Sequence, residues 1–172
     1  MFFFIITGQK GEGKTYLLEK LAELLKQNEF SVGGIVTRGQ EEKKFVDINT
    51  KKEESFWKDS DQLAEQIGNY KISKRALSFA EKVIEGITQE EYCFIDEMGW
   101  LEADKKGLYR VIKKLLDREK DNPNLKIIAI VRRQVIEKIK KLCEIEVERI
   151  WFYERKEYDR TLPEIYKTVT KA

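Results

Sequence analysis

Residues 1–15, MFFFIITGQKGEGKT, join a short run of apolar residues to a glycine-rich turn and the start of a helix. Gly8 to Thr15 fit the phosphate-binding pattern G-x-x-x-x-G-K-S/T, the Walker A motif, between the strand and the amphipathic helix that the pattern requires. Glycines let successive backbone N–H groups point at one anion, and the helix adds the positive end of its dipole. The stretch therefore predicts a polyphosphate site, against the alternative of an ordinary glycine-rich corner between a strand and a helix.

The motif gives separate roles to its polar residues. Lys14 is positioned to reach the β- and γ-phosphates of a nucleotide, which makes it a candidate catalytic residue. The hydroxyl of Thr15 is positioned to bind the Mg²⁺ that bridges these phosphates, so we expect Mg²⁺ as the cofactor. The expected nucleotide-binding residues are Gly8, Gln9, Lys10, Gly11, Glu12, Gly13, Lys14, Thr15 and Tyr16.

The composition indicates one globular domain over residues 1–172. The chain has 172 residues, of which 41% are hydrophobic, and this is enough for one well-packed core. Its 33 basic and 31 acidic side chains leave a net charge of +2, so no overall field indicates a nucleic-acid or membrane partner. Because the sequence has no histidine, acid–base chemistry must fall to carboxylates, lysine, tyrosine or cysteine.

The cysteines and the first residues bear on the location of the protein. Cys93 and Cys143 lie in or near apolar segments without Cys-x-x-Cys spacing, which is typical of buried, reduced thiols in a cytoplasmic protein. The apolar run before Gly8 is too short for a signal peptide, and the longest apolar runs fall far short of a membrane span. We therefore expect a cytoplasmic protein.

Apolar strands alternate with amphipathic helices along the chain. Strands are predicted at 1–6, 31–38, 92–95, 126–131 and 147–153, and helices at 14–28, at 74–87, after Asp104, around 135–142 and at 162–169. Ser73 is expected to cap the second helix, Asp104 the third, and Pro163 to open the last. This order predicts an α/β fold, a three-layer sandwich whose mostly parallel sheet is covered by helices on both faces.

Two regions interrupt this alternation. Residues 43–57 read as a β-hairpin inserted beside the main sheet. Its expected packing residues are Phe45, Ile48, Phe56 and Trp57. Residues 58–71 are polar and irregular, and we expect a mobile surface connection there. The strand before the hairpin ends at Thr37 and Arg38, which either face a ligand at the carboxyl edge of the sheet or form a solvated strand end.

A phosphate loop needs a carboxylate on a neighbouring strand, because an acidic residue there holds the other side of the metal ion. Asp96 follows the apolar strand 92–95 and fits this position, known as the Walker B motif. Thr15 and Asp96 are therefore the expected Mg²⁺ ligands. Glu97 is positioned to polarise an attacking water as general base. The alternative is an Asp-Glu pair that caps a helix or a turn.

Two arginines follow strand 126–131 at the same expected edge of the sheet. One guanidinium there would reach the γ-phosphate and stabilise its charge in the transition state. Arg132 and Arg133 are adjacent and cannot both point inward. We assign the catalytic role to Arg132, while the pattern itself leaves open which of the two faces the site, and two solvent-facing arginines are the alternative.

Several segments together resemble a known family, the small P-loop nucleoside-triphosphatases first described in thermophiles, which have a cancer-related human relative. Besides the phosphate loop, the matching segments are Gly33-Gly34-Ile35-Val36-Thr37-Arg38, Asp96-Glu97-Met98-Gly99-Trp100-Leu101-Glu102, Ile130-Val131-Arg132-Arg133 and Leu162-Pro163-Glu164-Ile165. The resemblance spans nearly the whole chain. It implies a RecA-like sheet and a slow hydrolysis of ATP, GTP and other nucleoside triphosphates to diphosphate and phosphate, with broad base tolerance.

The chain departs from the family at one segment. The family often carries Asn-Arg-Asp shortly before its Leu-Pro, whereas this chain has Glu157-Tyr158-Asp159, so the arginine is missing. This puts a role of the segment in base contact or catalysis in doubt. Tyr158 either stacks on a nucleobase or packs as a surface tyrosine.

Two other functions would use the same scaffold. A nucleotide or small-molecule kinase would pass the γ-phosphoryl group to an organic acceptor under a lid that excludes water. Lys71, Lys74 and Arg75 form the nearest basic cluster of the kind that such a lid uses. In a nucleotide-gated binding module, the hairpin and residues 58–71 would instead switch between ordered and disordered states when the γ-phosphate is present.

Overall fold

The computed structural model describes residues 1–67, 70–118 and 121–172. Its strands are β1 (Phe2–Thr7), β2 (Val32–Arg38), β3 (Lys44–Asp47), β4 (Glu53–Ser55), β5 (Leu63–Ile67), β6 (Tyr70–Ser73), β7 (Tyr92–Met98), β8 (Lys126–Val131) and β9 (Arg149–Phe152). Its α-helices are α1 (Lys14–Gln27), α2 (Lys74–Glu85), α3 (Trp100–Ala103), α4 (Tyr109–Asp117), α5 (Ile136–Cys143) and α6 (Tyr158–Val169). Short 3₁₀ turns at Arg133–Val135 and Arg155–Glu157 precede α5 and α6.

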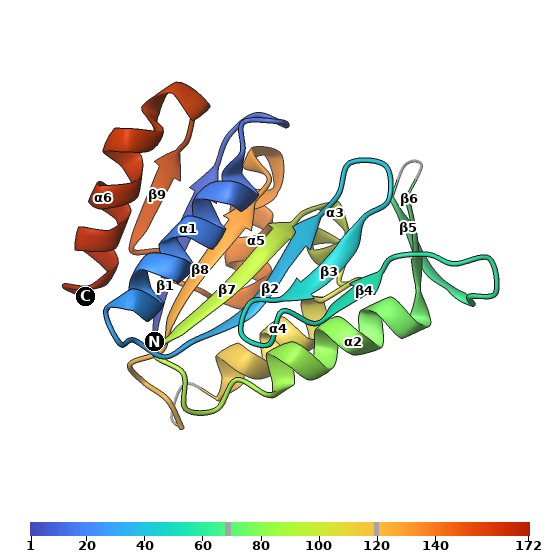
Figure 1. The fold of residues 1–172 in the computed structure, drawn as a ribbon. Helices are drawn as coiled ribbons and strands as arrows, with labels where there is room; N and C mark the ends of the chain where they lie inside the picture. The colour runs from blue at the N-terminus through green and yellow to red at the C-terminus, as the bar shows by residue number, and fades with distance from the viewer. Residues whose placement is uncertain (68–69, 119–120) are drawn as a thin grey trace.

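The main sheet is mostly parallel and has the strand order β4-β3-β2-β7-β8-β1-β9 (Figure 1). Parallel pairs run from β2 to β7, from β7 to β8, from β8 to β1 and from β1 to β9. Strand β8 therefore lies between the strand that leads into the phosphate loop and the strand that carries Asp96. The α/β class and the mostly parallel, RecA-like sheet that the sequence indicates are confirmed.

Helices cover both faces of this sheet, as a three-layer sandwich requires. Alternate residues of β1 enter different cores: Phe4 and Ile6 pack with α1 and α6, while Phe3 and Ile5 pack with α2, α4 and α5. A parallel strand that is buried on both faces has no polar side, which is why the first residues read as an unbroken apolar run. The two helical layers are seen on opposite sides of the sheet in Figure 1.

The two central strands β2 and β7 approach closely at a glycine. Gly34 has a φ of +116°, and a Cβ atom there would lie 2.1 Å from the carbonyl oxygen of Phe94. A side chain at this position would therefore both strain the backbone and push the strands apart. Gly34 therefore permits the close backbone contact between the two strands.

The inserted hairpin extends the main sheet. Strand β3 pairs antiparallel with both β2 and β4, so the hairpin adds two strands at the edge of the parallel sheet. Phe45, Ile48 and Phe56 are buried as expected, and the ring centroids of Phe45 and Phe56 lie 4.4 Å apart. Trp57 is only half-buried and is covered by the ammonium group of Lys71.

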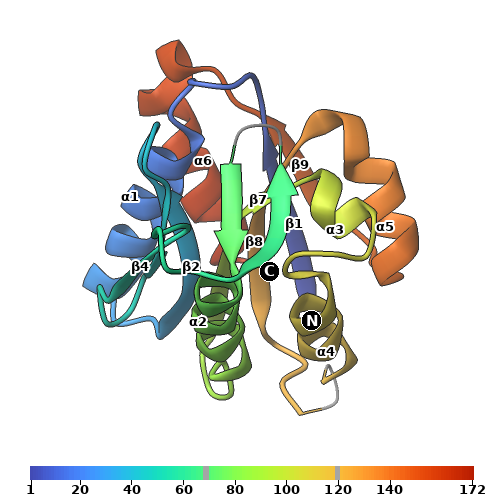
Figure 2. The same ribbon diagram turned by 90° about the vertical axis from the view of Figure 1, so that its right-hand side faces the viewer.

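The prediction of an irregular connection at 58–71 is confirmed for residues 58–62, which form no helix or strand, but it is wrong for residues 63–67 and 70–71, which form strands; residues 68–69 lie outside the described residues. Strands β5 and β6 form a second antiparallel hairpin at the N-terminal end of α2 (Figure 2). The hairpin is anchored at its base, where the backbone N–H of Ser73 donates to the carbonyl of Phe56 at 2.8 Å. A short two-stranded ribbon needs few apolar residues, so its sequence resembles that of a loop.

Two helix starts also differ from expectation. Asp104 does not cap the helix that follows it; instead it ends α3, and α4 begins five residues later at Tyr109. Pro163 does not open the last helix, which begins at Tyr158 and contains the proline within it. Proline removes one main-chain hydrogen bond from a helix. The helix continues because Ile165 and Val169, beyond the proline, are fully buried against the sheet.

The close contact at Gly34 provides a test of this packing. We expect Gly34→Ala to lower the free energy of unfolding by at least about 3 kcal/mol, because it adds backbone strain to an overpacked contact between central strands. Gly86→Ala is the matched control, since Gly86 has an ordinary helical φ of −71°, and its effect should stay within about 1 kcal/mol. Urea unfolding of both variants measures the change in the free energy of unfolding. Equal losses of stability in the two variants would contradict the close backbone contact at Gly34.

Candidate active site

The phosphate loop adopts the conformation that its glycines predict. Gly11 and Gly13 have φ values of +87° and +82°, and Gly13 is the N-cap of α1. No atom lies within 4 Å of where a Cβ would be at either residue, so the space that the loop faces is open. Gly8 is different, because a Cβ there would lie 2.3 Å from the carbonyl oxygen of Tyr153. The loop is thus held against the end of β9 on one side and open on the other.

Lys14 lies over the loop from which it starts. Its Nζ donates to the carbonyl oxygen of Gly8 at 3.1 Å and to that of Gln9. Partial burial lowers the pKa of the Lys14 ammonium, while the nearby carboxylates of Asp96, Glu12 and Glu97 oppose this effect. An ammonium that has lost part of its hydration gains strongly from an anion that binds next to it.

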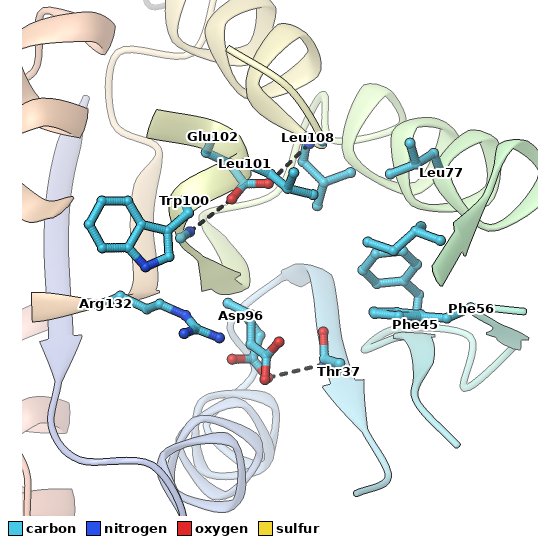
Figure 3. Close-up of a pocket in the computed structure, with 14 residues that line it drawn as sticks. Thr37, Phe45, Phe56, Leu77, Asp96, Trp100, Leu101, Glu102, Leu108 and Arg132 are labelled. Atoms are coloured by element: carbon cyan, nitrogen blue, oxygen red, sulfur yellow. Dashed lines mark hydrogen bonds between the residues drawn. The ribbon is translucent and has the colours of Figure 1, made fainter. Parts of the chain in front are cut away.

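Asp96 joins three elements of the site. Its Oδ2 accepts a hydrogen bond from Thr15 Oγ1 at 2.8 Å. The same oxygen accepts one from the backbone N–H of Thr37 at 3.0 Å (Figure 3). Its Oδ1 is buried and has no hydrogen-bond partner among the described residues. Burial, together with the charge of Glu97, raises the pKa of Asp96 to about 7 against the opposing effect of these hydrogen bonds. The predicted pair of Thr15 and Asp96 is therefore brought together, and Thr37 joins it.

Glu97 points away from the core beside Asp96, at an irregularity of β7. Its φ is +63°, and the register of β7 with β8 shifts between Ile95 and Met98. Both carboxylate oxygens of Glu97 accept hydrogen bonds from Lys43 Nζ, at 2.8 and 2.7 Å. Sequence reasoning missed Lys43, because the contact joins residues 54 apart and a lysine in a charged turn carries no periodic signal.

The structure separates the two adjacent arginines. The guanidinium of Arg132 points toward Asp96 in Figure 3, and Arg132 lines the same pocket as Asp96 and Glu97. Arg133 instead places its guanidinium 5.4 Å from the ring centroid of Phe152. The assignment of Arg132 to the inner position, which the sequence pattern left open, agrees with this geometry.

Beside the carboxylates, the pocket continues between the inserted hairpin and α3. Its other walls are formed mainly by apolar residues that belong to the core: Phe45, Phe56, Ile72, Leu77, Leu101 and Leu108. Glu102 also lines this pocket and is buried. Its carboxylate accepts hydrogen bonds from the backbone N–H groups of Gly99 at 2.8 Å and Leu108 at 3.2 Å. Glu102 thus fixes the turn after Glu97, and burial raises its pKa.

The remaining predicted residues lie around the loop with varied contacts. Glu12 accepts a hydrogen bond from the backbone N–H of Arg155 at 2.8 Å, which ties the loop to the segment after β9. Tyr16 is 53% exposed, and its ring centroid lies 5.6 Å from that of Tyr158. Arg38 does not join Thr37 in the site, because it pairs with Glu19. The side chains of Gln9 and Lys10 are exposed.

Fold and site together define a P-loop nucleotide-binding protein: a glycine-rich loop at a helix N-terminus, its lysine, and a hydroxyl–carboxylate pair across the sheet. In the described part of the chain no three or more acidic or cysteine side chains gather where a metal ion would fit. Among the described residues, moreover, no helix has the length and apolarity needed to span a membrane.

Comparison with known proteins identifies the family. Residues 3–165 match the model of the NTPase family, and the chain therefore belongs to this family. It is 28% identical over 153 residues to the nucleoside-triphosphatase THEP1 of Thermotoga maritima, covering 83% of each chain. It is also 28% identical to the THEP1 of Thermofilum pendens over 125 residues, which are 68% of this chain and 69% of that protein.

Two solved structures share the fold. The solution structure of a human cancer-related nucleoside triphosphatase superposes with a TM-score of 0.76 at 18% identity, covering 100% of this chain and 99% of the other. The crystal structure of THEP1 from Aquifex aeolicus gives a TM-score of 0.73 at 18% identity, with coverage of 97% and 98%. The likeness supports the fold class from coordinates as well as from sequence.

The raised pKa of Asp96 leads to a test of stability against pH. Its folded-state value of about 7 lies above the ordinary 3.8, so the unfolded chain loses this proton first and the contribution of Asp96 to stability falls as the pH rises from 4 to 7. Between pH 5 and pH 8, the free energy of unfolding of the wild-type protein should therefore fall by about 2 to 3 kcal/mol relative to that of the Asp96→Asn variant. Urea unfolding in metal-free buffer measures the difference, and a gap that does not change with pH would contradict the raised pKa.

Proposed function

We propose that this protein hydrolyses nucleoside triphosphates to nucleoside diphosphate and phosphate, depends on Mg²⁺, accepts several bases and turns over slowly. The observation that carries the proposal is the hydrogen bond between Thr15 and Asp96, which brings the end of the phosphate loop against a buried carboxylate. Membership of the NTPase family supports the same activity. The two buried, free cysteines fit the cytoplasmic location that the sequence predicts.

The residues at the Thr15–Asp96 pair fit a magnesium ion. Mg²⁺ prefers oxygen ligands and is commonly held by one or two carboxylates together with substrate phosphates. Thr15 offers a hydroxyl oxygen, and Asp96 offers the buried Oδ1 that has no hydrogen-bond partner among the described residues. Thr15 and Asp96 would hold the ion, which when bound supplies charge neutralisation at the β- and γ-phosphate oxygens.

The other residues divide the chemistry between binding, proton transfer and charge stabilisation. Lys14 and the loop amides bind the phosphates. Glu97 accepts a proton from a water whose oxygen attacks the γ-phosphorus, while the bond to the bridging oxygen breaks and its electrons stay with the diphosphate. Arg132, which lines the same pocket, stabilises the charge on the transferred group.

The observations favour water over an organic acceptor. A kinase needs a basic lid over the acceptor, but two of the three basic residues that sequence reasoning considered, Lys71 and Arg75, have other partners. Lys71 lies 5.0 Å from the ring centroid of Trp57, and Arg75 pairs with Glu54 and with Asp61. Glu97, in contrast, is 39% exposed beside the pocket and is accessible to water.

Base tolerance is proposed from the two tyrosines beside the loop. Asp96 and Glu97 lie on the β7 side of the loop, so the γ-phosphate belongs there and the nucleoside end belongs on the side of β9 and α6. The exposed ring of Tyr16, packed against Tyr158, lies on that side. Stacking on an aromatic ring tolerates every base, because every base has a π-face.

Phosphate release tests the proposed function directly. The wild-type protein should release phosphate from ATP, GTP, CTP and UTP at low rates, only with Mg²⁺, and without labelling added nucleosides or nucleoside monophosphates. Lys14→Ala should abolish release while leaving the folded protein intact, because loss of one charge-assisted contact to a desolvated anion costs about 2 to 5 kcal/mol. Label that appears mainly on an organic acceptor, or undiminished release by Lys14→Ala, would refute the proposal.

The separation of the two arginines gives a second test with an internal control. Arg132→Ala should lower the single-turnover rate by about 100-fold or more, in line with the roughly 1000-fold or greater gain that a cis arginine supplies in related chemistry. Arg133→Ala should change the rate by less than about 3-fold, because Arg133 contacts Phe152 and not the pocket. Equal losses in the two variants would show that neither arginine acts specifically on the γ-phosphate.

A further inference from the structure

The conformation of Glu97 requires a tertiary contact to hold it. A glutamate at a φ of +63° lies in the left-handed region, which costs about 1 to 3 kcal/mol for a residue other than glycine. Such a conformation persists only where the surrounding structure fixes it. The contact that meets Glu97 is the ammonium group of Lys43, which donates to both carboxylate oxygens at 2.8 and 2.7 Å.

Lys43 is held rigidly on the inserted hairpin. Its carbonyl oxygen accepts a hydrogen bond from the backbone N–H of Phe56 at 2.8 Å, and the next residue, Lys44, pairs in register with Arg38 of β2. The side chain of Lys43 is 11% exposed, much less than that of Glu97. The Lys43 ammonium therefore approaches Glu97 from a fixed strand end. Glu97 is the more exposed of the two side chains, so Lys43 orients Glu97 and not the reverse.

The contact leaves the carboxylate able to act on water. A carboxylate has about four lone-pair positions on its two oxygens, and Lys43 takes one on each. The remaining positions on Glu97 are free of that contact, and the Glu97 side chain is 39% exposed. The positive charge also lies beside two adjacent carboxylates, Asp96 and Glu97, and so reduces the repulsion between them.

We propose that Lys43 is a positioning residue, which holds the carboxylate of Glu97 in the orientation that activates the attacking water. The inserted hairpin then contributes to the reaction through this side chain. The inference rests on the proposed hydrolysis and adds to it a residue from outside the sequence motifs. Lys43 acts through Glu97, so its removal affects the chemical step more than the binding of the nucleotide.

The first part of the test separates kcat from KM. Lys43→Ala should lower kcat for ATP by about 10- to 100-fold, since small misplacement of a reacting group has effects of this size, and should change KM by less than about 3-fold. Lys43→Arg should recover most of the lost kcat, because a guanidinium also donates to both oxygens of a carboxylate. Lys44→Ala is the matched control: Lys44 pairs with the exposed Glu53, and its variant should keep the wild-type kcat.

The second part asks whether Lys43 acts through Glu97. In a Glu97→Gln background, the further change Lys43→Ala should lower the single-turnover rate by less than about 2-fold, because a residue whose partner is gone has nothing left to orient. Equal losses in both backgrounds would overturn the inference and indicate direct contact with phosphate. An unchanged or increased kcat of folded Lys43→Ala would overturn it as well. If the wild-type protein releases no phosphate at all, the proposed function fails and the inference fails with it. If the protein hydrolyses nucleotide but substitution of Lys43 has no effect, only the inference is refuted.

Discussion

The carboxylate of Asp96 is the point on which the site depends. One of its oxygens accepts from the first turn of α1 and from the end of β2, so a single buried atom sets the distance between the phosphate loop and two neighbouring strands. These elements lie apart in the sequence, and β8 separates β1 from β7 in the sheet. The cost of burying this charged group is visible in its raised pKa. A buried acidic group with an unused oxygen is expected where a cation is to be bound, and is otherwise unfavourable.

The core explains why the strand ends meet at a fixed position. Alternate residues of β1 enter the cores on the two faces of the sheet, so the strand cannot slide by one residue without exchanging its apolar contacts. At Gly34 the neighbouring strands leave no room for a side chain. The packed strands thus present Thr37, Asp96 and Arg132 at one edge of the sheet.

Local signals allowed much of this to be predicted from the sequence. The phosphate loop, Asp96 and the alternation of strands and helices depend on residues that are adjacent or periodic, and their positions follow from spacing alone. The ribbon of β5 and β6 could not be predicted in this way, because a short two-stranded ribbon carries little apolar pattern in its sequence. The start of α6 was misplaced because burial of Ile165 and Val169 outweighed the effect of Pro163. Lys43 was missed because its partner lies on a distant strand, and only the folded chain brings the two together.

The resting position of Lys14 has a consequence for the exchange of ligands. Its ammonium group already has two carbonyl acceptors, from Gly8 and Gln9, in the protein without nucleotide. In the proposed function, a phosphate that binds Lys14 replaces these carbonyl partners, so the gain in free energy is the difference between phosphate and carbonyl as acceptors. When the phosphate departs, the same carbonyls are at hand to receive the ammonium again. Under the proposed function, this exchange of acceptors limits what Lys14 adds to the affinity for phosphate and makes release of a bound product easier.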